Sequence, residues 1–377
     1  KIDEIARAFH LDAIGLDRDV TELCGGQRTK ILLARLLLEK PDILLLDEPT
    51  NYLDEQHIAW LQRYLIEYEN AFILISHDIP FLNSVVNIIY HMENQELNRY
   101  VGDYDHFLAV YEAKRAQQKA AYEKQQQEIS ALKDFVARNK ARVATRNMAM
   151  SRQKKLDKMD VIELAKEKPK PEFTFKTARA SGKVLFETED LVIGYDSPLS
   201  KPLNLRMERG EKIALTGANG IGKTTLLKSI LGLTDPYSGR AILGDYLYPG
   251  YFEQEMSGDM TRTCIEEIWD CFPSMTQYEV RSALAKCGLT TKHIESQLRV
   301  LSGGEQAKVR LCKILNTQTN FLLLDEPTNH LDADAKAELK RALQAYSGSI
   351  LLICHEPDFY RDIAEKVIDC MEWSLKI

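Results

Sequence analysis

A nine-residue stretch, Gly217-Ala218-Asn219-Gly220-Ile221-Gly222-Lys223-Thr224-Thr225, restricts the fold of this chain more than any other feature. It fits the pattern G-x-x-x-x-G-K-S/T, and it follows an apolar strand-like run and precedes a helix-like run. In that setting the glycines let successive backbone N–H groups point at phosphate oxygens, and the helix N-terminus adds its dipole. We therefore predict a phosphate loop rather than a plain glycine-rich turn. Lys223 would reach the β- and γ-phosphates, and the Thr224 hydroxyl would bind Mg²⁺.

Two parts of the chain repeat the same landmarks at a distance of 278 residues. The matched pairs are Gly25 and Gly303, Asp47 and Asp325, Asp54 and Asp332, and His77 and His355. Four matched pairs that are all separated by the same number of residues, with no insertion or deletion between them, indicate two copies of one unit. The same offset would place a phosphate loop of the first copy ahead of Lys1. We therefore expect an incomplete first copy that exposes a sheet edge where the strands of the other part would pair.

Each copy contains an apolar run that ends in two carboxylates, Asp47-Glu48 in the first and Asp325-Glu326 in the second. Such runs predict parallel strands that are covered on both faces, and open α/β sheets bind ligands at the carboxyl ends of their strands. Phosphoryl transfer needs mainly positioning and charge neutralisation. We therefore expect Asp325 to hold Mg²⁺ through water, and Glu326 to orient or deprotonate the attacking water.

A histidine follows the next apolar run in each copy, His77 in the first and His355 in the second. A single histidine at the end of a strand is more often an ordinary polar residue than a ligand-binding one. Its recurrence at the same offset favours a functional role. His355 is expected to contact the γ-phosphate.

A pair of glycines precedes a helical run in each copy, in Leu23-Cys24-Gly25-Gly26-Gln27 and in Leu301-Ser302-Gly303-Gly304-Glu305. Gly25-Gly26 is expected to interrupt the helical pattern of residues 1–40. Ser302 could serve only as a helix N-cap. The two carboxylates that follow each glycine pair at equal spacing favour a functional role instead.

The segment between the copies differs in composition. From Asp103 to Lys168 it contains no Gly or Pro, which favours long helix. Apolar residues at heptad spacing, with two more that would face them from a returning helix, predict a hairpin with its turn near residues 144–151. These residues are Ile129, Leu132, Val136, Val143, Leu156 and Met159. Lys168-Pro169-Lys170-Pro171 then ends the helical segment.

Charge is distributed unevenly along the chain. Residues 109–170 carry sixteen Lys and Arg against eight Asp and Glu, a net charge of +8. The whole chain carries −7, which leaves −15 for the remainder. Eight basic residues gather near the turn: Arg138, Lys140, Arg142, Arg146, Arg152, Lys154, Lys155 and Lys158. A basic helical tip on an acidic body predicts a partner rich in phosphate, although a solvated spacer has the same composition.

Composition excludes several classes of protein. The 377 residues are 45% hydrophobic, without a run long enough to span a membrane and without an apolar signal core at the start. The seven cysteines form no C-x-x-C pair, which favours reduced thiols in a cytosolic chain over a disulfide or zinc framework.

Taken together, the phosphate loop, the two glycine-pair turns, the Asp-Glu pairs and the histidines resemble the ATP-binding cassette (ABC) ATPases. The runs Asp47–Asp54 and Asp325–Asp332, and the basic linker between tandem copies, resemble the ABC-F subfamily. The resemblance implies an α/β fold of tandem P-loop NTPase domains joined by an α-helical hairpin linker. The implied parts are a first cassette at 1–104, a linker at 105–171 and a second cassette at 172–377.

The resemblance also implies specific roles. ATP and Mg²⁺ would bind between the cassettes, with Gly217–Thr225 facing Cys24, Gly25, Gly26 and Gln27, while Ser302, Gly303, Gly304 and Glu305 form the second signature turn. Tyr195 would stack on adenine, and Gln254 would link Mg²⁺ to the signature subdomain. The implied partners are ribosomal RNA and the P-site tRNA in the cytoplasm, with cassettes that pair within one chain. Both a translation factor and an antibiotic-resistance protein that protects the ribosome fit this pattern.

Two departures from the family pattern leave other functions open. Cys24 stands where the family usually has serine, and a thiol is a weaker hydrogen-bond donor than a hydroxyl, so turnover is expected to be reduced. The first phosphate loop is not part of this sequence. A soluble ATPase subunit of a transporter and a regulatory protein without turnover therefore remain as alternatives, and the basic linker argues against the first of them.

Overall fold

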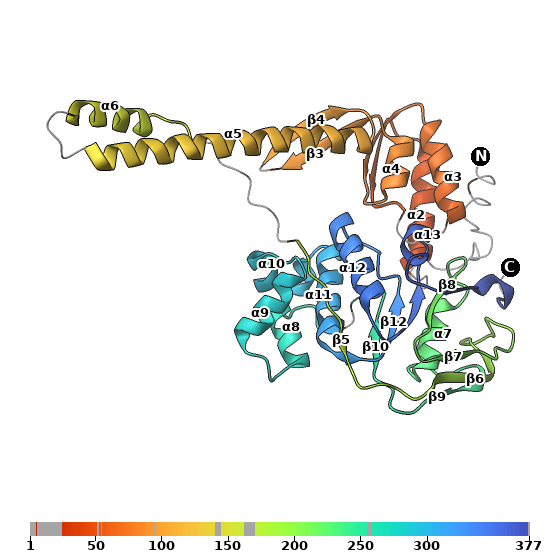
Figure 1. Ribbon diagram of the computed structural model, residues 1–377. Coiled ribbons are helices and arrows are strands. Elements are labelled where there is room, and N and C mark those ends of the chain that lie inside the picture. The colour runs from red at the N-terminus through yellow and green to blue at the C-terminus, as the bar shows by residue number, and fades with distance from the viewer. Residues whose placement is uncertain are drawn as a thin grey trace. The chain divides into compact units, whose positions relative to one another are not determined.

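The computed structural model describes residues 5, 25–50, 53, 55–93, 95–139, 145–161, 170–254, 256 and 258–375 (Figure 1). The chain divides into two compact units, residues 1–78 together with 168–377, and residues 79–167. The domain bounds expected from the sequence stay a prediction. None of the described helices combines the length and the apolar composition that crossing a bilayer requires.

The second copy is built on a parallel five-stranded sheet. Its strands, in spatial order, are β10 (Pro249–Phe252), β12 (Phe321–Asp325), β13 (Ser349–Ile353), β8 (Lys212–Thr216) and β14 (Lys366–Asp369). Every residue of β12 and β13 is buried, which confirms coverage on both faces for these two strands. Alternate residues of β12 face two apolar clusters, with Phe321 and Leu323 in one cluster and Leu322 and Leu324 in the other.

The cluster that contains Phe321 lies under the helix of the phosphate loop, α7 (Lys223–Ile230), and an antiparallel sheet. That sheet has the order β7 (Arg206–Glu208), β6 (Val184–Val192), β9 (Ser238–Leu243). The cluster that contains Leu322 is covered by helices α8 (Cys264–Cys271), α9 (Gln277–Lys286), α10 (Thr291–Glu295), α11 (Gly303–Asn316), α12 (Ala333–Ala345) and α13 (Pro357–Tyr360). The remaining elements are the parallel pair β5 (Lys176–Thr177) and β11 (Gln318–Thr319) and the short 3₁₀ turns η3 (Leu298–Val300) and η4 (Cys370–Glu372).

The described part of the first copy contains α2 (Gly25–Glu39), β1 (Ile43–Asp47), α3 (Glu55–Ile66) and β2 (Ala71–Ile75). Gly25 and Gly26 form the first turn of α2, and the residues just before them lie outside the described part of the chain, so the expected helix break there stays a prediction. Strands β1 and β2 pair in parallel without a further partner strand among the described residues, in line with the expected exposed edge.

Coverage of β1 on both faces, which the apolar run predicted, is wrong for the residues that the structure describes. Leu44 and Leu46 are buried, whereas Ile43 and Leu45 are 61% and 65% exposed. Their counterparts in the second copy, Phe321 and Leu323, are buried in the cluster that α7 and β6 cover. An apolar run therefore shows that both faces of a strand are able to pack against apolar side chains. Whether both faces are covered depends on the helices and sheets that lie over them.

The second unit carries the linker. It contains α4 (Ile79–Val85), the hairpin of β3 (Ile88–Glu93) and β4 (Glu96–Val101), and two helices, α5 (Tyr104–Asn139) and α6 (Arg146–Asp157). Figure 1 shows α5 and α6 side by side, which confirms the predicted helical hairpin. The prediction that the turn lies near residues 144–151 is wrong for residues 146–151, because they are helical in α6.

Among the described residues, two side-chain contacts join α5 to α6, and a third joins α5 to the segment after α6. The Lys155 ammonium lies 2.6 Å from the Glu128 carboxylate, and the Arg152 guanidinium stacks 3.6 Å over the ring of Phe135. The side-chain amide of Gln125 donates to the carbonyl oxygen of Asp160 at 2.7 Å. Ile129, Val136 and Ala149 are buried, whereas Val143 lies outside the described residues.

Candidate functional site

The phosphate loop has the backbone shape that its sequence predicts. Gly217, Gly220 and Gly222 adopt positive φ angles of 125°, 81° and 104°, a region that residues with a Cβ rarely adopt. A Cβ at Gly222 would also lie 2.7 Å from the Ile193 side chain. Gly222 is the N-cap of α7, so the loop leads directly into a helix N-terminus that favours anions.

The side chain of Lys223 is buried and folds back over the loop. Its ammonium donates to the carbonyl oxygens of Gly217 and Ala218, each at 2.8 Å. These bonds satisfy a buried charge and hold the ammonium above the concave side of the loop. The predicted phosphate contact of Lys223 fits this placement.

Asp325 ends β12 and is 1% exposed. Burial, with a smaller contribution from the charge of Glu326, raises the pKa of its carboxyl to about 7 despite the lowering effect of the nearby Thr224 hydroxyl. Neither carboxylate oxygen has a hydrogen-bond partner of good geometry among the described residues. A buried carboxylate without donors is costly, and a cation bound there would remove that cost.

Asp325 and Thr224 supply the oxygen ligands that Mg²⁺ prefers. Among the residues that the structure places, no group of three or more His, Cys, Asp or Glu side chains could hold a metal by itself. A carboxylate and a hydroxyl beside a phosphate loop instead fit a cation that shares its coordination with nucleotide phosphates.

Glu326 follows Asp325 in a strained backbone conformation, with φ at 48°. Its N–H donates to the carbonyl of Ile353 at 3.0 Å, which anchors it to β13. One carboxylate oxygen lies 3.2 Å from Nε2 of His355, and the other accepts from Gln254 at 2.8 Å and from Asn329 at 2.6 Å.

Charge and hydrogen bonds keep the Glu326 carboxylate ionised. Burial raises the pKa of Glu326. This effect is outweighed by the hydrogen bond and charge of His355, the charge of Lys223 and the amide of Asn329, which all lower the pKa. The pKa consequently lies below its ordinary value. An ionised carboxylate with a fixed orientation can accept a hydrogen bond from a water molecule.

The structure brings together most of the predicted residues and adds one that the sequence reasoning missed. Gln254, Asp325, Glu326 and His355 lie at the carboxyl end of the sheet, beside the phosphate loop. Asn329 was not predicted, although Asn51 stands at the matching position of the first copy and is the signal that could have found it.

Tyr195 lies near the phosphate-loop helix with its ring 64% exposed. Its hydroxyl is 3.4 Å from the Thr225 hydroxyl, so the ring stands close to the nucleotide side of α7. An exposed ring in this place is free to stack, and the adenine contact stays a prediction.

The second signature turn forms the start of α11. Ser302 is its N-cap, with a reciprocal capping box in which the Ser302 N–H donates to Glu305 at 2.8 Å and the Glu305 N–H donates to the Ser302 hydroxyl. The N-cap alternative is therefore realised in the structure, and nucleotide contact by this turn stays a prediction. His293 Nε2 lies 3.3 Å from the other Glu305 oxygen.

A close approach explains why glycine stands at position 304. A Cβ there would lie 2.5 Å from the carbonyl oxygen of His330, whereas a Cβ at Gly303 would meet only the His330 ring, at 3.2 Å. The ion pair of Lys308 and Asp332, 2.6 Å long, holds the same two segments together.

We expect Gly304→Ala to lower the free energy of unfolding by about 1–3 kcal/mol, because the new methyl group would collide with a backbone atom. Gly303→Ala is the matched control. Its neighbour is a side chain that can rotate, and alanine favours helix over glycine by roughly 1 kcal/mol, so its stability should stay the same or rise. Urea denaturation followed by circular dichroism measures both. Equal changes in the free energy of unfolding for the two variants would contradict the proposal that the His330 carbonyl leaves no room for a side chain at position 304.

The first copy reproduces part of the geometry around Glu326. Glu48 has φ at 46°, its N–H donates to the carbonyl of Ile75 at 2.8 Å, and His77 Nε2 lies 3.5 Å from its carboxylate. Burial raises the pKa of Glu48. Gly25, Gly26 and Gln27 lie in the first turn of α2, as Gly303–Glu305 do in α11, whereas Cys24 and Asp54 lie outside the described residues.

Comparison with known proteins identifies the family. A family model described as ABC transporter matches residues 2–51 and 200–329, and a second model of that description matches residues 90–175. The ABC transporter ATP-binding protein YfmM of Bacillus subtilis is 74% identical over 377 residues, which cover all of this chain and 73% of that protein. ABC transporter F family member 2 of Arabidopsis thaliana is 36% identical over 382 residues. These cover all of this chain but only 56% of the plant protein, so the chain spans little more than half of that relative.

Solved structures share the fold at low sequence identity. An archaeal ribosome recycling factor, ABCE1, in complex with a ribosomal stalk protein, matches with a TM-score of 0.61 and 21% identity. That match covers 98% of this chain and 65% of the archaeal one. The fold agrees with these structures. The chain therefore belongs to the ABC-F family of ATP-binding cassette ATPases.

Proposed function

We propose that this protein hydrolyses ATP between its two cassettes and uses the resulting closure and release to act on the ribosome. The observation that carries the proposal is the helical hairpin of α5 and α6, whose tip is basic on an otherwise acidic chain. A cassette that only supplied ATP hydrolysis to a membrane partner would have no use for such a hairpin.

At the nucleotide site, each residue has a task that follows from its geometry. Lys223 and the N–H groups of the phosphate loop would bind the β- and γ-phosphates. Thr224 and Asp325, with Gln254 nearby, would hold Mg²⁺, which supplies charge neutralisation when bound. Glu326 would accept a hydrogen bond from the attacking water, and His355, Gln254 and Asn329 would fix the orientation of its carboxylate.

The hairpin presents cations that internal ion pairs do not neutralise. Arg138 and Lys155 pair with Asp134 and Glu128 within the hairpin. Arg146, Lys154 and Lys158 are exposed, and no carboxylate of the described residues lies within ion-pair distance of them. Such cations suit a phosphate backbone, which binds them without regard to sequence.

The comparisons support a ribosomal partner. The titles of structures with the same fold describe ABCE1 as a ribosome recycling factor and as ribosome-bound. For this chain we propose that the hairpin contacts ribosomal RNA and the P-site tRNA, which places the protein in the cytoplasm. Assistance of ordinary translation and displacement of a ribosome-bound antibiotic are both forms of this function.

Replacing Arg146, Lys154 and Lys158 together with glutamine should weaken sedimentation with ribosomes. Each phosphate contact contributes about 0.7–0.9 to the slope of log K against log salt, so the slope should become shallower by about 2–3. Cosedimentation across a series of KCl concentrations measures this slope.

The matched control replaces three exposed lysines of the other unit, Lys176, Lys183 and Lys286, with glutamine. It removes the same charge and should leave the slope unchanged. An equal loss in both variants would show that net charge alone causes binding. No loss in either would contradict the proposal and favour the transporter alternative, which pull-down with a membrane partner would then test.

A further inference from the structure

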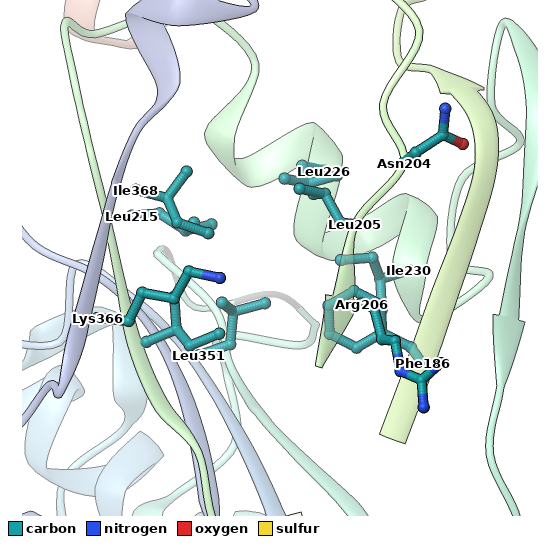
Figure 2. Close-up of a pocket in the computed structure, with 11 residues that line it drawn as sticks. Phe186, Asn204, Leu205, Arg206, Leu215, Leu226, Ile230, Leu351, Lys366 and Ile368 are labelled. Carbon is teal, nitrogen blue, oxygen red and sulfur yellow. The ribbon is translucent and has the colours of Figure 1, made fainter. Parts of the chain in front are cut away.

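A cavity of about 110 Å³ lies beside the phosphate-loop helix, α7, which contributes Leu226 and Ile230 to its lining. Figure 2 shows its lining side chains, which come from α7, the edge of the parallel sheet and the antiparallel sheet. Its floor consists of core residues that are at most 3% exposed, among them Leu215, Leu226, Ile230 and Leu351. The cavity therefore opens from the surface into the hydrophobic core of the second cassette.

The size and the walls of this cavity select a small apolar group. A cavity of roughly 150 Å³ lined by Leu, Ile and Phe accommodates benzene, and this one is of the same order with the same kinds of residue. Drug-sized ligands need roughly 300 Å³ or more, which excludes them here.

Polar side chains line only part of the cavity, and two of the three are already engaged. Arg206 pairs with Glu187 at 2.7 Å and with Glu208 at 3.1 Å, and in Figure 2 its nitrogens point away from the cavity. Asn204 exchanges hydrogen bonds with Asp190 at 2.8 and 3.0 Å.

Lys366 of β14 differs from these two side chains. In Figure 2 its nitrogen points toward the cavity, and no carboxylate in the described part of the chain pairs with it. A single available ammonium above an apolar pocket is complementary to a carboxylate that carries a small apolar body.

We propose that this cavity is a binding site for a small aromatic or branched-chain monocarboxylate, whose apolar body enters the core while its carboxylate pairs with Lys366. Such a ligand would contact Leu226 and Ile230. These residues lie three and seven positions after Lys223, on the same side of α7. A bound ligand would therefore contact the helix that carries the phosphate-binding lysine.

Benzoate is a suitable probe, because it joins a ring of the right size to a carboxylate. We expect it to shift the NMR signals of the Leu226 and Ile230 methyl groups in the full chain, with roughly millimolar affinity for a ligand of this size. Lys366→Gln should weaken binding about tenfold, because a charge-assisted hydrogen bond is lost. Ile368 also lines the cavity, so Ile368→Trp should abolish binding by filling it. Lys176→Gln, an exposed lysine on β5, is the control and should bind as the parent chain does.

Three results would overturn the proposal. The first is the absence of shifts at these methyl groups with benzoate at ten times the expected dissociation constant. The second is toluene binding as tightly as benzoate, with no effect of Lys366→Gln, which would mean that the carboxylate plays no part. The third is acetate producing the same shifts as benzoate, which would mean that only surface charge is sensed. Unchanged signals of methyl groups remote from the cavity confirm that each variant is folded.

Discussion

Replacing Glu326 with glutamine should lower the ATPase turnover by about 10²–10⁴-fold while ATP binding is retained. The carboxylate is the group in the site that is held ionised and oriented, with Gln254 and Asn329 donating to one oxygen and His355 beside the other. Glutamine keeps the shape but loses the charge, and it must present an amide N–H₂ to groups that already donate. The phosphate loop is unchanged by the substitution, so affinity for ATP should change little.

Single-turnover phosphate release measures the hydrolysis step, and fluorescence titration with a labelled ATP measures binding. Glu356→Gln is the matched control, because Glu356 follows His355 but pairs with Lys336 at 2.9 Å rather than with the site. It should leave turnover within about twofold, as expected for a surface pair of small energy. A Glu326→Gln variant with the turnover of the parent chain would exclude Glu326 as the water-binding carboxylate.

Lys223→Ala should weaken ATP binding by about 10²–10³-fold, since two charge-assisted contacts to phosphate oxygens are lost at once. The variant also frees the carbonyl groups of Gly217 and Ala218, which Lys223 holds in the structure. The loop should therefore lose part of its shape as well as its charge.

Titration calorimetry with ATP and Mg²⁺ measures the affinity, and the melting temperature shows whether the cassette is still folded. Lys228→Ala, in the last turn of the same helix, is the control and should change affinity by less than about threefold, because a partly screened charge contributes little. Full affinity in a folded Lys223→Ala variant would contradict the assigned role.

Local chemistry explains why much of the site could be predicted. The phosphate loop is a local structure, in which glycines and a lysine at fixed spacing determine the backbone and the group that it binds. The repeat added information, because His77 and His355, and likewise Asp47 and Asp325, recur at one offset, which indicates two copies of one unit. These features depend on residues near one another in the sequence.

Other features depend on contacts between distant segments. Gln254 donates to Glu326 across 72 positions of the chain, and the clash that demands Gly304 comes from His330. The exposure of Ile43 and Leu45 is a further example. The sequence of their strand, β1, closely resembles that of β12, but both faces are buried only in β12.

The sequence by itself determined the fold class, the repeat, the phosphate loop, the paired carboxylates and the basic hairpin. Each of these features depends on the types of residue present and on their spacing along the chain. Only the tertiary structure decided which groups hold Glu326, which faces of the sheets are covered, and that a cavity remains beside α7 with Lys366 at its opening. Packing is the physical reason: side chains from segments far apart in the chain must fill one space, and neither their fit nor their gaps can be read from the order of residues.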